Sequence, residues 1–182
     1  DRVEIRLQDY RDVPERFDRI VSVGMFEHVG ARYYDTYFAA VRDHLHPDGV
    51  ALIHTIGRLG RPGVTNPWIR RYIFPGGYIP SMSEVTAAIE RQQLASTDIE
   101  VLRLHYAHTL AEWFRRFQGV RAEVAAEKGE RFCRMWEFYL AASEMAFHHR
   151  GLVVFHFQLA RDQTAVPLTR DYLLEATTGR AC

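Results

Sequence analysis

The sequence predicts an α/β domain in which helices alternate with the strands of a sheet. Two signals predict this class: short apolar runs at residues 16–24, 50–56 and 152–159, and a helical periodicity at residues 34–45 between the first two runs. A strand, a helix and a second strand at this spacing form a unit whose strands are parallel. The length of 182 residues, of which 47% are hydrophobic, suits one globular domain.

About five strands are expected, and the first covers residues 1–7, where apolar side chains alternate with polar ones. Residues 16–24 hold a near-continuous apolar core at 20–23, which is typical of a strand buried on both faces of a parallel sheet. The remaining strands are expected at residues 50–56, 99–106 and 152–159.

The first helix is predicted at residues 34–45, where apolar side chains recur on one helical face. It ends at residues 46–49 (HPDG), because proline and glycine do not continue a helix. A short helix is expected at residues 68–74, within a stretch rich in glycine and proline.

Two sequences of capping-box form, Ser81-x-x-Glu84 and Thr109-x-x-Glu112, predict the beginnings of two further helices. Another helix is expected at residues 129–149. The last two helices both precede the final strand, so they form a helical insertion. Helices are expected on both faces of the sheet.

Composition excludes several classes of protein. The 23 basic residues balance the 23 acidic ones, and nucleic-acid binding is not expected without a cationic excess. No apolar run approaches the roughly 18 to 20 residues that span a bilayer. The two cysteines, Cys133 and Cys182, lack CxxC or CxxH spacing, which excludes a disulfide scaffold and a zinc finger. No metal site is expected, since HExxH and comparable spacings are absent, and the chain has no GxGxxG or P-loop motif.

Polar side chains stand near the carboxyl ends of three predicted strands, where ligands bind in open α/β sheets. Glu27 follows the second strand, His54 lies near the end of the third, and Tyr106 ends the fourth. A carboxylate, an imidazole and a phenol that meet in one crevice suit proton transfer or the binding of a small polar anion.

Each of these three residues also has a purely structural explanation. Glu27 could serve the N-terminus of the following helix, His54 could be a hydrogen-bonded core histidine, and Tyr106 could be an ordinary strand tyrosine. The residues alone leave both interpretations open.

Residues 49–83 contain four arginines and no aspartate or glutamate. These arginines are Arg58, Arg61, Arg70 and Arg71, and the side chains between them include Leu59, Trp68, Ile69, Tyr72, Ile73, Phe74 and Tyr78. The mixture suits anionic headgroups beside apolar chains and predicts contact with lipid. The alternative is an arginine-rich loop whose aromatic side chains pack in the core.

From about residue 3 to residue 160, the chain resembles the cyclopropane-fatty-acyl-phospholipid synthases of the mycolic acid cyclopropane synthase family. The matching segments are LQDYRD at 7–12, FDRIVSVGMFEHVG at 17–30, YDTYF at 34–38, HTIG at 54–57, PWIRRYIFPGGYIPS at 67–81 and HYAHTLAEW at 105–113. MFEHVG and IFPGGYIPS are the most specific of these motifs.

The resemblance implies a class I methyltransferase fold with a Rossmann-like sheet. It implies that the methyl group of S-adenosylmethionine is transferred to the double bond of an unsaturated acyl chain in a membrane phospholipid. The resulting carbocation then loses a proton to a bound bicarbonate, and a cyclopropane ring closes. The family also implies a bacterial cytoplasmic protein, peripheral on the inner face of the cytoplasmic membrane, and a homodimer is compatible with the full-length protein.

The resemblance assigns site residues motif by motif. Glu27, His54, Tyr106 and the backbone at Ile56 correspond to the bicarbonate site. His54 and Tyr106 are expected to donate hydrogen bonds to the anion, whereas Glu27 accepts its hydroxyl proton. The implied cofactor-binding residues are Gln8, Asp9, Val23, Gly24, Met25 and Phe26. The lipid-facing residues are expected to be Arg58, Arg70, Arg71, Tyr72, Phe74 and Tyr78.

Two departures from the family pattern stand out. The glycine-rich cofactor loop, the acidic residue for the ribose and an upstream cysteine should all precede Asp1, so the chain is expected to be the C-terminal part of a synthase. Residues 1–160 are then part of the catalytic domain, and residues 161–182 form a polar tail. Ser143 stands where relatives commonly carry a cysteine, and no covalent role is expected for it.

Two other functions are left open. One is a related methyltransferase that makes a methyl-branched lipid or methylates another acceptor, although the intact set of Glu27, His54 and Tyr106 favours the ring. The other is a truncated, non-catalytic fragment that binds lipid, which the lack of the cofactor loop suggests.

Overall fold

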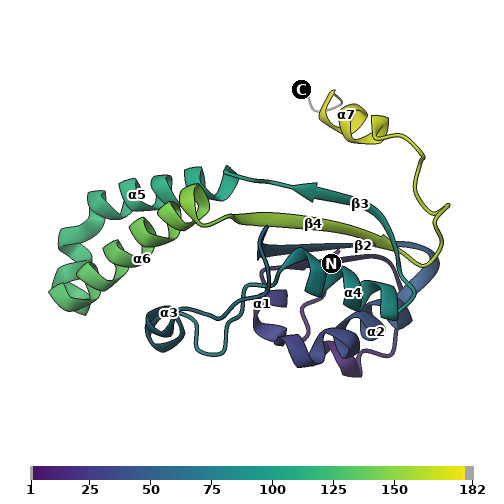
Figure 1. Cartoon of the computed structure of the whole chain (residues 1–182), viewed down its shortest axis with the longest axis horizontal. Coiled ribbons are helices and arrows are strands. Elements are labelled where there is room, and N and C mark those ends of the chain that lie inside the picture. The colour runs from purple at the N-terminus through teal and green to yellow at the C-terminus, as the bar shows by residue number, and fades with distance from the viewer. Residues whose placement is uncertain (1, 179–182) are drawn as a thin grey trace.

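The computed structural model describes residues 2–178, which form one mixed sheet with helices around it (Figure 1). The strands are β1 (Phe17–Val23), β2 (Leu45–Arg58), β3 (Ala95–Val101) and β4 (Leu152–Ala160). They lie in the order β1-β2-β4-β3. β1 and β2 are parallel, and β4 is antiparallel to both of its neighbours. The predicted α/β class is confirmed, with four strands among the described residues.

Helices alternate with these strands along the described chain. The first ones are α1 (Phe26–Val29), α2 (Tyr34–His44), α3 (Pro67–Tyr72) and α4 (Met82–Arg91), with short 3-10 turns at Tyr10–Asp12 and Ala31–Tyr33. The later ones are α5 (His105–Lys128), α6 (Glu130–His149) and α7 (Asp171–Thr178).

The predicted strand–helix–strand unit is confirmed as β1, α2 and β2. α2 buries Tyr37, Phe38 and Val41, which share one helical face. It ends at His44, and β2 begins at Leu45, earlier than expected. The pairing of β2 with β1 is irregular at first, because the register shifts between Phe17 and Arg19. Residues 46–49 therefore end the helix and form the irregular start of the strand.

The capping box at the beginning of α4 is confirmed. The Glu84 N–H donates to Ser81 Oγ at 3.4 Å, and the Ser81 N–H donates to the Glu84 carboxylate at 2.8 Å. The Tyr78 hydroxyl donates to the same carboxylate at 2.8 Å. Glu84 thus fastens the end of the long loop to the helix that follows it.

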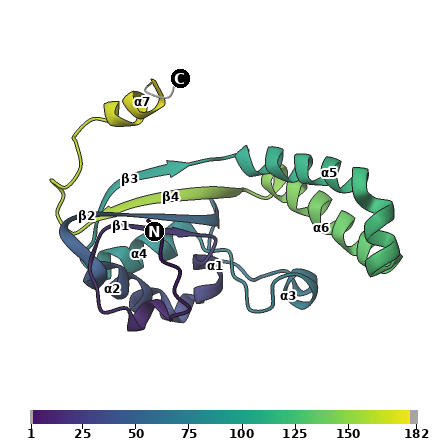
Figure 2. The ribbon, with the colours of Figure 1, turned by 180° about the vertical axis from the view of Figure 1, so that it is seen from behind.

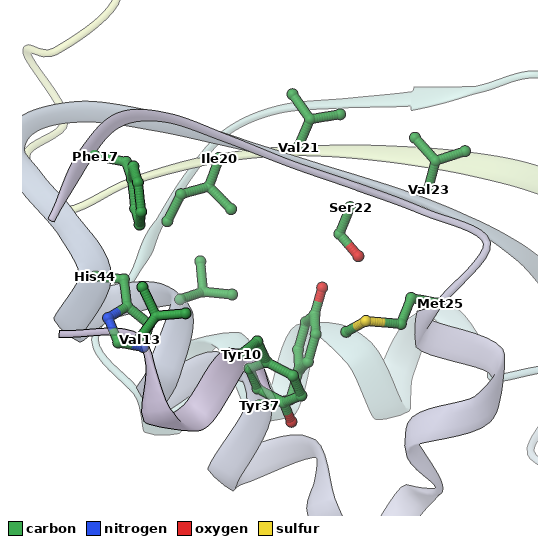
Figure 3. Close-up of a pocket in the computed structure, with 11 residues that line it drawn as sticks. Tyr10, Val13, Phe17, Ile20, Val21, Ser22, Val23, Met25, Tyr37 and His44 are labelled. Carbon is green, nitrogen blue, oxygen red and sulfur yellow. The ribbon is translucent and has the colours of Figure 1, made fainter. Parts of the chain in front are cut away.

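β1 is the edge strand of the described sheet and is far more exposed than its apolar run predicts. Val21 and Val23 are 66% and 64% exposed. Figure 3 shows both pointing away from the side on which Ile20 and Ser22 lie. The expectation of burial on both faces is wrong, because nothing within residues 2–178 packs over Val21 and Val23.

The strand expected at residues 1–7 is also wrong. Residues 2–9 form no strand, and Val3, Ile5 and Leu7 are 83%, 93% and 108% exposed. Residue 1 lies outside the described part of the chain. An alternating pattern becomes a strand only where a neighbouring strand takes up its backbone hydrogen bonds, and this segment pairs with none of the four strands.

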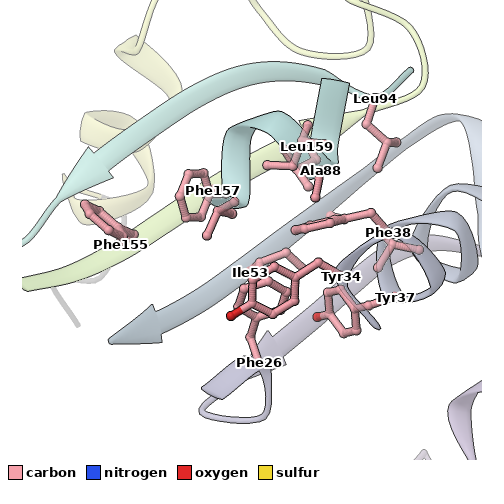
Figure 4. Close-up of a cluster of buried hydrophobic side chains, with 14 of the residues drawn as sticks. Phe26, Tyr34, Tyr37, Phe38, Ile53, Ala88, Leu94, Phe155, Phe157 and Leu159 are labelled. Carbon is pink, nitrogen blue, oxygen red and sulfur yellow. The ribbon is translucent and has the colours of Figure 1, made fainter. Parts of the chain in front are cut away.

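The main hydrophobic core lies between one face of the sheet and the helices α1, α2 and α4 (Figure 4). Phe26, Ile53 and Phe157 are fully buried in it. Phe26 stacks on Tyr34, with 4.4 Å between the ring centroids. Burial of each such side chain contributes about 1.5–3 kcal/mol. This core holds α1, and with it Glu27, against the end of β2.

The predicted helical insertion is confirmed as the α5–α6 hairpin, which extends beyond the end of the sheet (Figures 1 and 2). Leu110, Leu140 and Phe147 are buried between its helices, together with Cys133. Val154 of β4 joins this second cluster, whereas its neighbours in β4 belong to the main core. Helices therefore pack on both faces of the sheet, although the hairpin covers only one end of its face.

The boundary between β3 and α5 differs from the prediction. β3 ends at Val101 and α5 begins at His105, so Tyr106 lies in a helix and not at the end of a strand. The second predicted capping box is wrong, because Thr109 Oγ1 lies inside α5 and donates to the His105 carbonyl at 3.4 Å. Threonine commonly makes this bond within helices, so its pattern with Glu112 does not mark a beginning.

The last described segment leads from β4 to α7. Arg170 donates to Asp98 of β3 at 2.6 Å, and the Tyr172 hydroxyl donates to Gln158 of β4 at 3.2 Å. The segment expected as a polar tail thus has contacts with the sheet. Residues 179–182, which include Cys182, lie outside the described part.

Gly57 of β2 is predicted to tolerate no side chain. A Cβ there would lie 2.2 Å from Phe155 Cε2 and 3.3 Å from the Pro80 carbonyl oxygen. Because overpacking a core costs about 1–3 kcal/mol, Gly57→Ala should lower the free energy of unfolding in urea by that amount. Gly60→Ala is the control, since a Cβ there meets nothing within 4 Å. Equal losses in the two variants would contradict the prediction.

Candidate active site

Glu27 lies in α1, directly after β1, and its carboxylate turns toward the end of β2. The Ile56 N–H donates to Glu27 Oε1 at 2.7 Å, and the Tyr78 N–H donates to the Glu27 carbonyl at 2.8 Å. The second carboxylate oxygen, Oε2, is buried and has no hydrogen-bond partner. A buried carboxylate oxygen without a donor is costly, so this atom indicates a place for a polar ligand.

His54 lies on β2, opposite His156 of β4. His54 Nδ1 is 2.8 Å from Nε2 of His156. Burial lowers the pKa of His54, and the charge of His156 acts in the same direction, whereas Glu27 opposes both. His54 therefore favours its neutral form, in which one ring nitrogen is a donor and the other an acceptor.

Tyr106 lies in the first turn of α5 and is half-buried by aromatic side chains. Its ring centroid is 5.3 Å from that of Phe147 and 5.8 Å from that of Trp113. Burial raises the pKa of Tyr106, and the charge of Glu27 raises it further. The phenol therefore stays protonated and can serve as a hydrogen-bond donor.

The three predicted residues converge, although by a different route from the one expected. The charge of Glu27 acts on the pKa of both His54 and Tyr106, so the carboxylate lies within electrostatic range of the other two groups. No hydrogen bond joins the three side chains directly. Glu27 accepts a hydrogen bond from the Ile56 N–H of β2. A residue that served only the N-terminus of its own helix would not make this bond.

Two members of the expected cofactor set line a cavity of about 340 Å³ beside β1, which Figure 3 shows. These are Val23 and Met25. Ser22 and Tyr37 direct hydroxyl groups into the same cavity, and burial raises the pKa of Tyr37 to about 12. Gly24, between the two lining residues, has a φ of 65°, which glycine adopts without strain.

The other expected cofactor residues are engaged elsewhere. Phe26 is fully buried in the main core and is not among the residues that line this cavity. Asp9 accepts hydrogen bonds from Arg11, whose guanidinium lowers the pKa of Asp9 to about 2. Gln8 donates to the Asp12 carbonyl at 2.8 Å.

The expected lipid-facing residues divide into two groups. Arg58 donates to the Ile79 carbonyl at 3.1 Å, and Tyr78 donates to Glu84, so both support the fold. The remaining residues are exposed, and they are Arg70, Arg71, Tyr72 and Phe74.

Tyr72 and Trp68 also line a wide groove of about 800 Å³ between α3 and α6. Its other lining residues are Asn66, Lys128, Arg131, Phe132, Arg134, Met135 and Phe138. Three of these are cations and none is an acid. Sequence reasoning missed these cations at the end of α5 and in α6, because acidic residues lie among them along the chain. Only the folded helices place the two kinds of charge on different faces.

Two further residues near the site escaped the sequence reasoning. His156 contacts His54 from a strand that lies 102 positions along the chain, and no pattern joins the two. Tyr139 of α6 lies near Tyr106 and faces Ser143, and burial raises its pKa. Among residues 2–178, no group of three or more His, Cys, Asp or Glu side chains is arranged so that it could hold a metal ion. None of the described helices has the length and hydrophobicity of a membrane-spanning segment.

Solved methyltransferases share this arrangement of strands and helices. Phosphoethanolamine N-methyltransferase 2 of Haemonchus contortus, solved with S-adenosylhomocysteine, superposes with a TM-score of 0.69 at 13% identity, over 84% of this chain and 36% of that chain. The protein therefore has the fold of class I S-adenosylmethionine-dependent methyltransferases.

The match to one family within this class is much closer. The mycolic acid cyclopropane synthetase family model matches residues 1–157, so the chain belongs to that family, as its motifs predict. The cyclopropane synthase MmaA2 of Mycobacterium tuberculosis superposes with a TM-score of 0.79 at 32% identity, over 85% of this chain and 59% of that chain.

A curated relative agrees with this assignment. Cyclopropane-fatty-acyl-phospholipid synthase of Escherichia coli is 43% identical over 159 residues, which cover 87% of this chain and 41% of the relative. The chain thus spans about two fifths of the length of this relative.

The lowered pKa of His54 predicts a pH-dependent contribution to stability. Folding favours the neutral ring, so the unfolded chain takes up the proton first as the pH falls. The contribution is complete above the ordinary histidine pKa of about 6.5 and is lost below it. Between about pH 7 and 5, the free energy of unfolding should fall more steeply in the parent than in His54→Gln. The free energies of unfolding come from urea titrations at each pH. If those of the parent and of His54→Gln fall in parallel with pH, this effect is excluded.

Proposed function

We propose that this chain carries the proton-accepting and lipid-facing part of a cyclopropane-fatty-acyl-phospholipid synthase. The proposed reaction transfers a methyl group from S-adenosylmethionine to the double bond of an unsaturated acyl chain in a membrane phospholipid, and removal of a proton then closes the ring. The observation that carries the proposal is the unsatisfied Glu27 Oε2, which is buried near His54 and Tyr106 in a chain of this family.

The residues of this site fit a bicarbonate ion. Glu27 Oε2 lacks a donor, and the hydroxyl group of bicarbonate is a donor. The protonated phenol of Tyr106 and a ring N–H of His54 can donate to the remaining oxygens of the anion. Bound bicarbonate would supply the base that removes the proton. The Ile56 N–H, which bonds Glu27, is a backbone donor at this site.

The surroundings of Tyr106 suit a cationic reaction. An alkene is a weak nucleophile, so it must be aligned closely with the methyl donor, and the cation must be kept from water. The aromatic rings around Tyr106, together with buried Leu110 and Phe147, form apolar walls on the hairpin side. We infer that these walls exclude water from the reacting carbons.

The cavity beside β1 fits one side of an S-adenosylmethionine site. Its apolar lining, which includes Ile20 and Met25, suits an adenine ring, and the hydroxyls of Ser22 and Tyr37 supply polar contacts. When bound, S-adenosylmethionine would supply the methyl group. No carboxylate is among the described residues that line this cavity.

We propose that the exposed arginines and aromatics of α3, with the cations of the α6 groove, face the surface of the cytoplasmic membrane. Arg70 and Arg71 would meet anionic headgroups, while Tyr72 and Phe74, each 42% exposed, would enter the acyl boundary. Phe138 is 56% exposed and forms an edge contact with Trp68 at 4.7 Å, which continues this apolar surface onto α6. The binding would be peripheral.

Removal of the Glu27 carboxylate and of the Tyr106 hydroxyl tests the catalytic roles. In the full-length protein, Glu27→Ala and Tyr106→Phe should each lower the rate of ring formation by about 10²-fold or more, in line with the typical contribution of acid–base groups. Tyr33→Phe is the control, because Tyr33 is a 46% exposed tyrosine of the 3-10 turn Ala31–Tyr33. Mass spectrometry of the lipids separates a ring from a methyl branch. Unchanged ring formation in both site variants would refute the roles, and a branched product in the parent would identify the related methyltransferase instead.

Charge reversal tests the membrane contact. Arg70→Glu/Arg71→Glu should bind vesicles of anionic phospholipid several-fold more weakly, and added salt should weaken the binding of the parent. Arg115→Glu/Arg116→Glu changes the net charge equally on the exposed surface of α5 and serves as the control. Co-sedimentation measures both variants. Equal vesicle binding by the two double variants would argue against a membrane contact through Arg70 and Arg71.

A further inference from the structure

A row of three titratable side chains crosses the sheet beside the proposed anion site. His54 of β2 pairs directly with His156 of β4, and His156 pairs directly with Glu100 of β3. His54 Nδ1 lies 2.8 Å from His156 Nε2, and His156 Nδ1 lies 3.4 Å from Glu100 Oε2. The row leads from the partly buried His54 to Glu100, whose side chain is 52% exposed.

The contact between the two rings requires one shared proton. Two ring nitrogens at 2.8 Å attract each other only when one of them is protonated and the other is not. The carboxylate of Glu100 favours a proton on the facing His156 Nδ1. Glu100 does not by itself fix the position of the proton between the rings. This proton lies either on His54 Nδ1 or on His156 Nε2.

Which of these two nitrogens carries the proton depends on the charge of His156. When His156 is neutral, its only proton is on Nδ1, so Nε2 accepts and His54 must donate from Nδ1. His54 then has a bare Nε2. When His156 takes up a second proton, its Nε2 donates to His54 Nδ1, and a neutral His54 carries its proton on Nε2.

The geometry points to His156 as a positioning residue that, together with Glu100, decides which nitrogen of His54 carries the proton. Since Nδ1 of His54 is engaged by His156, Nε2 is the nitrogen left for a ligand. A charged His156 makes His54 a hydrogen-bond donor to an anion, whereas a neutral His156 makes it an acceptor. The identity of that anion as bicarbonate rests on the proposed function, but the control of the tautomer does not.

The other charged groups around the row act on this equilibrium. Glu27 of α1 faces His54 and favours added positive charge there, while the two imidazoles disfavour simultaneous charging. Arg170, in the segment before α7, is bound to Asp98, and the charge of Glu100 raises its pKa. Arg170 therefore limits the negative potential that Glu100 exerts on His156. Binding of an anion beside His54 is expected to favour the tautomer in which His54 donates from Nε2.

Nitrogen-15 NMR of the histidine side chains in this chain tests the tautomer without any activity measurement. Spectra recorded from about pH 8 to about pH 5 bracket the ordinary histidine pKa. The expected result is that Nδ1 of His54 is protonated at high pH, and that the proton moves to Nε2 as His156 charges. A His54 that keeps its proton on Nε2 at every pH would overturn the inference.

Variants separate the row from general effects on the protein. In His156→Leu the pH-dependent exchange of tautomers at His54 should disappear. In Glu100→Gln the preference of His54 for a proton on Nδ1 at high pH should weaken, because no carboxylate then favours a proton on His156 Nδ1. His108→Leu is the control, since His108 is an exposed histidine of α5. If His156→Leu does not fold, the titration of the parent decides alone. An unchanged exchange in folded His156→Leu would also overturn the inference.

Carbon-13 bicarbonate added to the same samples separates this inference from the proposed function. Weaker binding at high pH in the parent, with the pH dependence lost in His156→Leu, is expected. Exchange of tautomers without any bicarbonate binding would retain the role of His156 and refute the proposed anion. Binding that is independent of pH in the parent would refute the coupling of His156 to the anion.

Discussion

The antiparallel pairing of β2 with β4 is the constraint on which the rest of the structure depends. It runs without interruption from Val50 opposite Ala160 to Arg58 opposite Leu152. Because successive side chains of a strand alternate between faces, β4 sends Phe155 and Phe157 into the main core and Val154 into the hairpin cluster. One ladder thus anchors both hydrophobic clusters, and a shift of one residue would exchange the two faces.

The same ladder assembles the candidate site from distant parts of the chain. It brings His156 beside His54, and the β2 end that it holds in place offers the Ile56 N–H to Glu27. The main core presses α1 against this end, while the hairpin cluster brings Tyr106 from the other side. The polar groups therefore gather at the seam between two apolar clusters. This position gives Glu27 a buried oxygen without a donor, and at the same time shields it from water.

Electrostatic coupling follows from this placement. Burial holds His54 toward its neutral form and Tyr106 toward its protonated form, and Glu27 acts on both. The exposed Glu100 connects the far end of the histidine row to solvent. Arg70, Arg71 and Tyr72 of α3 lie outside the core, near the hairpin that extends past the sheet (Figure 1), whereas Trp68 of the same helix packs against the hairpin cluster.

The sequence by itself determined the α/β class, the β1-α2-β2 unit, the capping box at Ser81 and the hairpin, because these depend on local periodicity and on short-range hydrogen bonds. Its motifs also selected Glu27, His54 and Tyr106. Only the tertiary structure decided that residues 2–9 pair with no strand, that β1 lies at an edge, and that Tyr106 belongs to a helix. The pairing of His54 with His156, and of His156 with Glu100, could not be predicted from the sequence either. Strand pairing joins residues far apart in the chain, and neither composition nor periodicity states which strands become neighbours.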